Sequence, residues 1–335
     1  MKRTYSPSKW MRRQAPSQFV IYFVPALISI ALVIMIYHQA LLIAPAYHHN
    51  LETFSASIFE LHPAWRPRLL SILLASRLTH WQSQINALDV QQQYVYSIGI
   101  WTAFWLAATN LLYVAALNRR SLFFLFGTYA GIAFGYMPGI SVRIYPWDMP
   151  PLFFFTLFVI LVHFDLYPWL MLVVPLATGF KETAIILSVA FLFWDSVSLQ
   201  KRLTYLGITL LGSIAVKVGM ALIVDNPSLF YTMIHRGPSG ENLFLLNLKT
   251  LFQPEGTYPI WINAATLVGF LIIPSISSKN TLFKLVAFLF IGATFVYGII
   301  TEYRIWFEMI PLSLYGLYYF STLDAYFDEN RSVLT

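Results

Sequence analysis

The feature that most constrains this chain is a series of long, continuous apolar runs separated by short polar turns. Many of these runs approach the roughly 20 residues that a helix needs to cross the hydrocarbon core of a membrane. The strands of an outer-membrane barrel are instead about ten residues long and alternate apolar with polar positions. Of the 335 residues, 58% are hydrophobic and 11% are charged, whereas soluble domains carry about 25% charged residues. The chain is therefore predicted to be an all-α polytopic membrane protein.

About ten of these runs are candidate transmembrane helices. The first follows a basic segment and is too long for the core of a signal peptide, so we interpret it as an uncleaved span. Several others are short and can be helices that reach only part of the way across. The predicted spans are Phe19–Tyr37, Tyr94–Leu117, Leu122–Met137, Pro151–Phe164, Tyr167–Phe180, Thr183–Trp194, Leu203–Val224, Pro259–Ile273, Leu282–Ile300 and Ile305–Phe320.

The distribution of lysine and arginine predicts the orientation of these spans. Segment Arg66–Trp81 has an apolar face bracketed by arginines and is short, so we expect an amphipathic helix that lies in the interface without crossing. With the amino terminus in the cytoplasm, the short basic turns then all fall on the cytoplasmic side, as the positive-inside rule requires. These turns are Asn118–Arg120, Lys201–Arg202 and the region around Lys279 and Lys284.

The resulting layout is a single transmembrane domain, 1–335, with both termini in the cytoplasm. A first outer loop, 38–93, carries the interfacial helix, and a second outer loop covers 225–258. The cytoplasmic segments are 1–18 and 321–335. The net charge of +6 serves orientation, so nucleic acid is not expected as a partner, and the absence of cysteine excludes disulfides and thiolate metal sites.

Ionisable residues collect on the predicted outer face. Such groups are costly close to hydrocarbon and persist where they do chemistry or bind a polar ligand. Carboxylates can act as general bases toward a hydroxyl, and arginines can bind a phosphate through two parallel hydrogen bonds. The pattern favours a site for a lipid phosphate that carries a group to be transferred. The candidate residues are Glu52, Glu60, Asp148, Glu182, Glu302, Arg66, Arg68, Arg143, Lys181, His235 and Arg304.

Several of these residues also have a purely structural interpretation. Asp148 can cap the helix that follows it. Lys181 and Glu182 can pair with each other at the tip of a hairpin. Arg304 can pair with Glu308 one turn later on the same helix face.

Other charged residues bear on lipid and metal binding. The Arg66–Arg68 segment can contact anionic lipid headgroups instead of a substrate. Lys217 lies in the middle of a predicted span, so we expect it to face the bundle interior and pair there, or to extend toward the interface. A divalent cation is a further candidate ligand, although the spacing of His48, His49 and His62 matches no metal-binding motif.

The segments Tyr145–Pro150, Phe180–Thr183 and Glu302–Arg304 resemble those of bacterial integral-membrane glycosyltransferases of the C-type (GT-C fold). The layout of many spans with a long first outer loop is similar as well. The resemblance implies an enzyme of the bacterial inner membrane. It would transfer a sugar from a polyprenyl-phosphate donor to a glycan or lipid acceptor on the outer face.

In such an enzyme an outer acid takes the proton of the acceptor hydroxyl. Many members place an acidic pair, often containing Asp, in the first outer loop, whereas this loop has only two glutamates before Asp89. The candidate acids therefore stay open between Glu60, Asp148 and Glu52. The basic residues of the outer face would neutralise the departing lipid phosphate, and Glu182 would orient them or bind sugar hydroxyls, as would Glu302.

Two other functions stay open. A transporter or flippase for a polar lipid predicts a polar path through the membrane, for which Lys217 and the break at Lys181 are the deep signals. A non-catalytic subunit of an envelope polysaccharide complex would need no converging charged site.

Overall fold

The computed structural model describes most of the region from residue 90 onward. These residues lie in helices and the turns between them, and no strand occurs among them, which confirms the predicted all-helical class for this part of the chain. The predicted span Pro259–Ile273 lies outside the described residues. The described residues are 90–117, 121–135, 148–223, 242–251, 278–297 and 303–318, with 23, 27, 30, 70, 71, 73–75, 77, 78 and 81.

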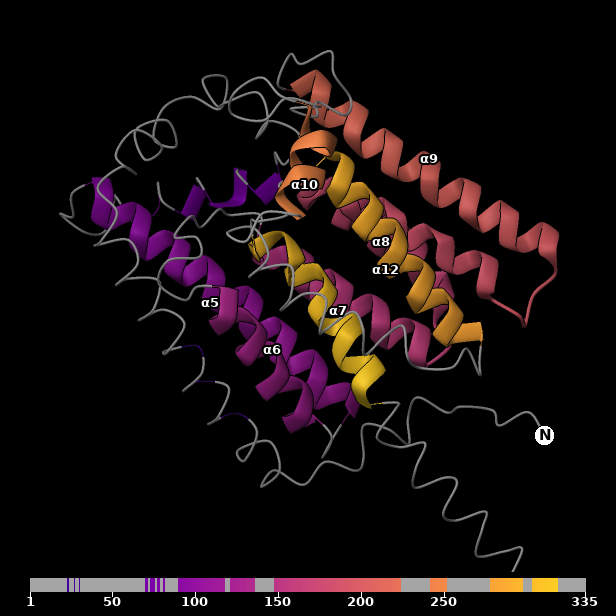
Figure 1. Ribbon diagram of the computed structural model, residues 1–335, viewed down its shortest axis with the longest axis horizontal. Coiled ribbons are helices and arrows are strands. Elements are labelled where there is room, and N and C mark those ends of the chain that lie inside the picture. Colours follow the sequence, from indigo (N-terminus) through magenta and orange to yellow (C-terminus); the bar gives the residue numbers. More distant parts are fainter. Residues whose placement is uncertain are drawn as a thin grey trace, which may run out of the picture.

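The helices follow the predicted apolar runs (Figure 1). In chain order they are α5 (Val90–Leu117), α6 (Ser121–Gly135), α7 (Met149–His163), η5 (Tyr167–Trp169), α8 (Leu170–Phe180), η6 (Glu182–Phe193), α9 (Leu199–Ile223), α10 (Leu243–Leu251), α12 (Ser278–Tyr297) and η7 (Tyr303–Glu308), where η marks 3-10 helices. Residues 309–318 continue from η7 as α-helix. Two stretches, Gly99–Leu117 and Leu199–Leu222, are long and apolar enough to cross a membrane, and the other apolar helices are shorter.

The predicted break at Lys181 is the tip of a hairpin formed by α8 and η6. The ring of Tyr167, at the start of η5, stacks on Trp194, just after η6, with centroids 5.5 Å apart. Lys181 itself is extended, with φ −156° and ψ 134°, and its N–H donates to the carbonyl of Ala177. The two sides of the hairpin, η5 with α8 on one and η6 on the other, have similar lengths. Because η6 is a 3-10 helix, its 12 residues rise about 2.0 Å each and reach about 24 Å.

Aromatic contacts show the relative directions of the central helices. Phe155 and Phe158 of α7 contact Phe290 and Phe283 of α12, with ring centroids 6.0 Å apart in both pairs. Phe158, the later of the two residues in α7, thus contacts Phe283, the earlier of the two in α12. Helix α12 therefore runs antiparallel to α7.

The start of α7 and the end of α8 lie at the same end of the bundle. Phe154, near the start of α7, contacts Phe180, the last residue of α8, at a centroid distance of 5.2 Å. We call this the Lys181 end, because Lys181 follows Phe180. The opposite end, where α7 finishes, is the His163 end.

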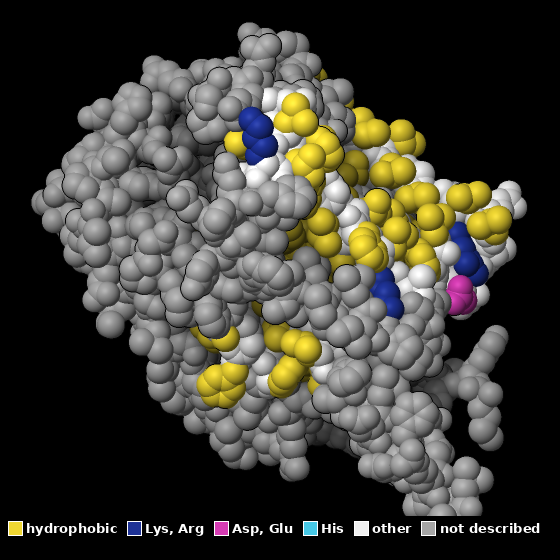
Figure 2. Space-filling view, viewed as in Figure 1, with side chains coloured by type: hydrophobic (Ala, Val, Ile, Leu, Met, Phe, Trp, Pro, Cys, Tyr) yellow, Lys and Arg dark blue, Asp and Glu magenta, His cyan; other side chains and the backbone are white. Residues whose placement is uncertain are grey.

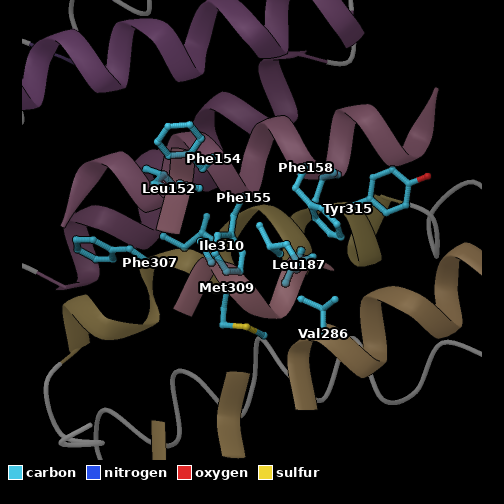
Figure 3. Close-up of a cluster of buried hydrophobic side chains, with 14 of the residues drawn as sticks. Leu152, Phe154, Phe155, Phe158, Leu187, Val286, Phe307, Met309, Ile310 and Tyr315 are labelled. Carbon is cyan, nitrogen blue, oxygen red and sulfur yellow. The ribbon is translucent and has the colours of Figure 1, made fainter. Parts of the chain in front are cut away.

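Helix α7 forms the centre of the bundle and is buried on nearly all sides. It contacts α5, α8, η6 and η7. A helix that is apolar all round has no preferred outer face and is therefore surrounded by neighbours. Figure 3 shows its side chains Leu152, Phe155 and Phe158 beside Leu187 of η6 and Ile310 of the last helix.

Helix α6 packs closely on residues 309–318 through two glycines one turn apart. A Cβ atom at Gly127 would lie 2.2 Å from Leu314 Cδ2, and one at Gly131 would lie 2.8 Å from Ile310 Cδ1. Small residues at this spacing allow two helix backbones to approach each other, a device common in membrane bundles.

The outside of the bundle is apolar where α9 lies. Leu203, Leu211 and Leu222 of this helix are exposed. Figure 2 shows hydrophobic side chains gathered on the same side of the molecule. A contiguous exposed apolar surface of this kind marks contact with lipid or with a partner.

The predicted interfacial segment Arg66–Trp81 is helical at each of its described residues. Leu70 and Leu73 pack with Val216 and Met220 of α9. These contacts lie toward the carboxyl end of α9 and help to cover the Lys181 end of the bundle.

We predict that Gly127→Leu lowers the free energy of unfolding by about 1–3 kcal/mol, because the added side chain enters space already filled by Leu314. The matched control is Gly207→Leu on α9, where an added Cβ meets no atom within 4 Å. That control should be neutral or slightly stabilising. Thermal unfolding of the detergent-purified variants measures both, and equal losses in the two variants would contradict the close packing of α6.

Candidate functional site: a buried charge cluster

The ammonium group of Lys181 forms an ion pair with the carboxylate of Glu308 inside the bundle. The side chain of Lys181 is 6% exposed and that of Glu308 is fully buried. Lys181 contacts Oε1 of Glu308, and the hydroxyl of Thr183 donates a 2.5 Å hydrogen bond to Oε2. Both carboxylate oxygens are therefore bound by the tip of the α8–η6 hairpin.

A buried ion pair of this kind is stable only as a complete unit. Removing a charge from water costs several kcal/mol, and the partner charge and its hydrogen bonds offset that cost. Glu308 and its chain neighbours Phe307 and Met309 are all buried, so its charge depends on partners within the protein. The pair therefore locks η7 onto the hairpin tip.

A second pair joins the hairpin tip to α9. Lys217 Nζ lies 3.9 Å from Glu182 Oε2, and the Lys217 side chain is 2% exposed whereas that of Glu182 is 32% exposed. Adjacent residues of the tip thus pair with different helices, Lys181 with η7 and Glu182 with α9. This arrangement differs from the interpretation in which Lys181 and Glu182 pair with each other. It agrees with the expectation that Lys217 faces the bundle interior.

The cluster is recessed below the end of α9. Lys217 precedes the last residue of the helix, Ile223, by six positions. At 1.5 Å per residue the cluster lies about 9 Å below that end. Of its charged groups, Glu182 is the most exposed and is the one best placed to meet a ligand.

Asp148 lies at the same end of the bundle, immediately before α7. It occupies the N-cap position, but its side chain makes no capping hydrogen bond. The residue is nevertheless buried. A carboxylate at a helix amino terminus is favoured by the helix dipole. Asp148 is therefore the N-cap residue of α7, as interpreted from the sequence, but without the side-chain hydrogen bond that usually accompanies this position.

Aromatic rings connect the start of α7 with the end of α8. The ring of Trp105 on α5 contacts Phe153, Phe154 and Phe180 at centroid distances between 5.2 and 5.8 Å. Its indole Nε1 is buried, and within the described part of the chain no hydrogen-bond acceptor reaches it. Among the described residues, the Lys181 end therefore holds a buried indole donor without an acceptor, in addition to its charges.

The other candidates from the sequence lie outside the described residues, either as whole residues or at their side chains. Arg304 lies in η7, but its side chain falls outside them. Glu308, its expected partner, is bound by Lys181 and Thr183. Also outside the described residues are Glu52, Glu60, Arg66, Arg68, Arg143, His235 and Glu302.

Glu308 and Lys217 are the members of the cluster that the sequence does not place in the outer-face site. The sequence offers Glu308 only as a partner of Arg304, and Lys217 only as a charge within a span. The signal was present, because a carboxylate between apolar neighbours such as Trp306 and Ile310 must find a cation inside the protein. Which cation it finds depends on the fold.

No group of three or more potential metal ligands of the types His, Cys, Asp and Glu occurs among the described residues. The histidines considered from the sequence, His48, His49 and His62, lie outside them. The cluster at the Lys181 end pairs its carboxylates with ammonium groups instead.

The His163 end has a different character. Lys279 donates a 3.0 Å hydrogen bond to the carbonyl of His163 and forms an ion pair with the exposed Asp165. Arg202, at the start of α9, pairs with the exposed Asp195. The ion pairs of this end are therefore more open to solvent than the pair between Lys181 and Glu308.

We predict that Glu308→Ala destabilises the protein by about 3–5 kcal/mol, because it leaves the Lys181 ammonium buried without a counter-charge. The double variant Lys181→Met with Glu308→Leu should recover most of this loss. Asp195→Ala, which removes an exposed partner of Arg202, should cost no more than about 1 kcal/mol. Thermal unfolding midpoints measure all three, and a double variant no better than Glu308→Ala would show that the pair is not the cause.

Comparison of the chain with family models, with curated proteins and with solved structures gave no match.

Proposed function

We propose that the protein is a polytopic glycosyltransferase of the bacterial inner membrane with C-type architecture and about ten spans. It would transfer a sugar from a polyprenyl-phosphate donor to a glycan or lipid acceptor at the outer face. The observation that carries the proposal is the cluster of Lys181, Glu182, Lys217 and Glu308, which comes from three separate parts of the fold. Charges so deep in an apolar bundle are a functional-site signal.

Three observations support the membrane part of the proposal. Two stretches have the length and composition of transmembrane helices, and the outer side of α9 is apolar. Arg202 and Lys279, at the starts of α9 and α12, lie at the His163 end, opposite to the cluster. Under the positive-inside rule this end faces the cytoplasm and the cluster faces outward.

The depth of the cluster suits a ligand that is anchored in the membrane. Helix α9 has 25 residues and is about 37 Å long, slightly more than the roughly 30 Å hydrocarbon core. A cluster about 9 Å below its end therefore lies near the boundary between acyl chains and headgroups. The phosphate of a polyprenyl lipid lies at a similar level.

The proposed reaction is a substitution at the anomeric carbon. The acceptor oxygen forms a bond to that carbon while the bond from the carbon to the phosphate oxygen breaks, which releases polyprenyl phosphate. The proton of the acceptor hydroxyl passes to a carboxylate. Asp148, Glu60 and Glu52 are the candidates for this acid.

The ion pairs change the role proposed for Lys181. Because Glu308 already balances its charge, we assign Lys181 to holding the hairpin tip in position. Glu182 is partly exposed and is assigned to the sugar hydroxyls, together with Glu302. We then assign binding of the lipid phosphate to the arginines Arg66, Arg68, Arg143 and Arg304. Binding of the acceptor is assigned to the loop that contains His235.

A transporter for a polar lipid is the second candidate. It is favoured by the burial of Lys217, which belongs to α9 and lies inside the bundle, because transporters keep ionisable groups within the membrane. A non-catalytic subunit is the third, since internal ion pairs need no ligand. Both predict that no glycosidic product forms.

We predict that Asp148→Asn and Glu182→Gln each lower sugar transfer by about 100-fold or more, because a general base or a substrate contact is lost. The assay uses purified protein in proteoliposomes with polyprenyl phosphates that carry radiolabelled hexoses, and follows label released from the lipid. Asp165→Asn and Asp195→Asn, at the opposite end, should leave transfer unchanged.

Thermal unfolding of each variant separates loss of chemistry from loss of fold. Transfer that is unaffected by both substitutions at the Lys181 end would refute the site. Label that crosses the bilayer while it stays attached to the lipid would favour the transporter.

A further inference from the structure

Helix α10 exposes apolar side chains and buries a polar one, which is the reverse of a surface helix of a soluble protein. Phe244, Leu245 and Leu248 are exposed, whereas the polar Asn247 is buried. At 100° per residue the three apolar positions lie within about 100° of each other, on the face opposite to Leu243. A helix that faces water normally presents its polar side outward.

The orientation of α10 is held by specific hydrogen bonds. Asn247 Nδ2 donates to the carbonyl of Phe295 on α12 at 2.8 Å. At the start of the helix, Asn242 Oδ1 accepts from the backbone N–H groups of Phe244 and Leu245 at 2.9 and 3.4 Å, which satisfies the first free donors. The exposure of the apolar face is therefore built into the fold.

The anchoring point places α10 at the Lys181 end. Helix α12 starts at the His163 end, where Lys279 meets His163, and Phe295 lies in its last turn. Twenty residues of α-helix are about 30 Å long, which equals the hydrocarbon thickness. Helix α10 therefore lies at the level of the membrane boundary, beside the end of α12 (Figure 1).

The exposed face of α10 continues an apolar surface of α12. Val296 of α12, next to the carbonyl that binds Asn247, is exposed, and so is Leu289 two turns earlier. Lys249, in the last turn of α10, is also exposed and is long enough to reach a phosphate at the interface. Because the exposed apolar face of α10 continues along the side of α12, whose 20 residues reach about 30 Å, lipid is the medium that fits this face.

We infer that α10 is an interfacial helix whose face of Phe244, Leu245 and Leu248 inserts into the outer leaflet. Lys249 lies toward the lipid phosphates. This inference rests on the membrane location in the proposed function and adds a lipid-binding element to the second outer loop. Because α10 lies at the Lys181 end, it brings lipid headgroups to the end of the bundle that holds the charge cluster.

The absence of cysteine from the chain makes a direct test simple, since one introduced cysteine is the only thiol. Leu245→Cys is labelled with a nitroxide in the full-length protein reconstituted in nanodiscs of phosphatidylethanolamine and phosphatidylglycerol. Collision with oxygen and with a water-soluble nickel chelate is then compared. Leu248→Cys provides a second position on the same face.

Leu211→Cys on the exposed side of α9 is the control for lipid exposure, and Asp195→Cys is the control for water exposure. We expect the labels on α10 to favour oxygen over the nickel chelate, as at 211, with a depth of about 5–10 Å. A water-like label on α10 with a lipid-like label at 211 overturns the inference and leaves the proposed membrane location intact. Labels shielded from both reagents would indicate a protein contact and overturn it as well, and a water-like label at 211 overturns both.

Discussion

The buried ion pair between Lys181 and Glu308 is the interaction on which the arrangement of the Lys181 end depends. It joins a hairpin tip to a helix 125 residues later, as the hydrogen bond from Thr183 shows. Without the partner, either charge would stay in an apolar core at a cost of several kcal/mol. The pair therefore determines how the hairpin and η7 sit against each other, and the neighbouring pair of Glu182 with Lys217 adds α9 to the same point.

Apolar packing supplies the rest of the framework. Helix α7 is buried on nearly all sides and serves as the axis against which its neighbours align. The glycines Gly127 and Gly131 let the last helix approach α6. These contacts are not directional, so they bring helices together without specifying which ends meet. The charged groups add that specification, because a wrong alignment would leave them unpaired.

The two ends of the bundle differ in a way that bears on function. The ion pairs of Lys279 and Arg202 at the His163 end have exposed acids as partners, whereas the cluster at the Lys181 end is largely withdrawn from solvent. One partly exposed carboxylate, Glu182, remains as a contact for a ligand. Interfacial lipid held by α10 beside this end would suit a substrate that arrives through the membrane rather than through water.

The sequence by itself determined the helical class, the positions of most helices and the interruption at Lys181, and it reduced Lys217 to two alternatives, of which the inward orientation is one. These follow from hydrophobic periodicity, from run length and from the cost of a charge near hydrocarbon, which are all local properties. Only the tertiary structure decided that Lys181 pairs with Glu308 rather than with Glu182, that η6 is a 3-10 helix, and that α10 exposes its apolar face. Ion pairs form between groups that are distant in the chain. Their choice therefore depends on which helix ends the packing brings together, and no local pattern of residues contains that information.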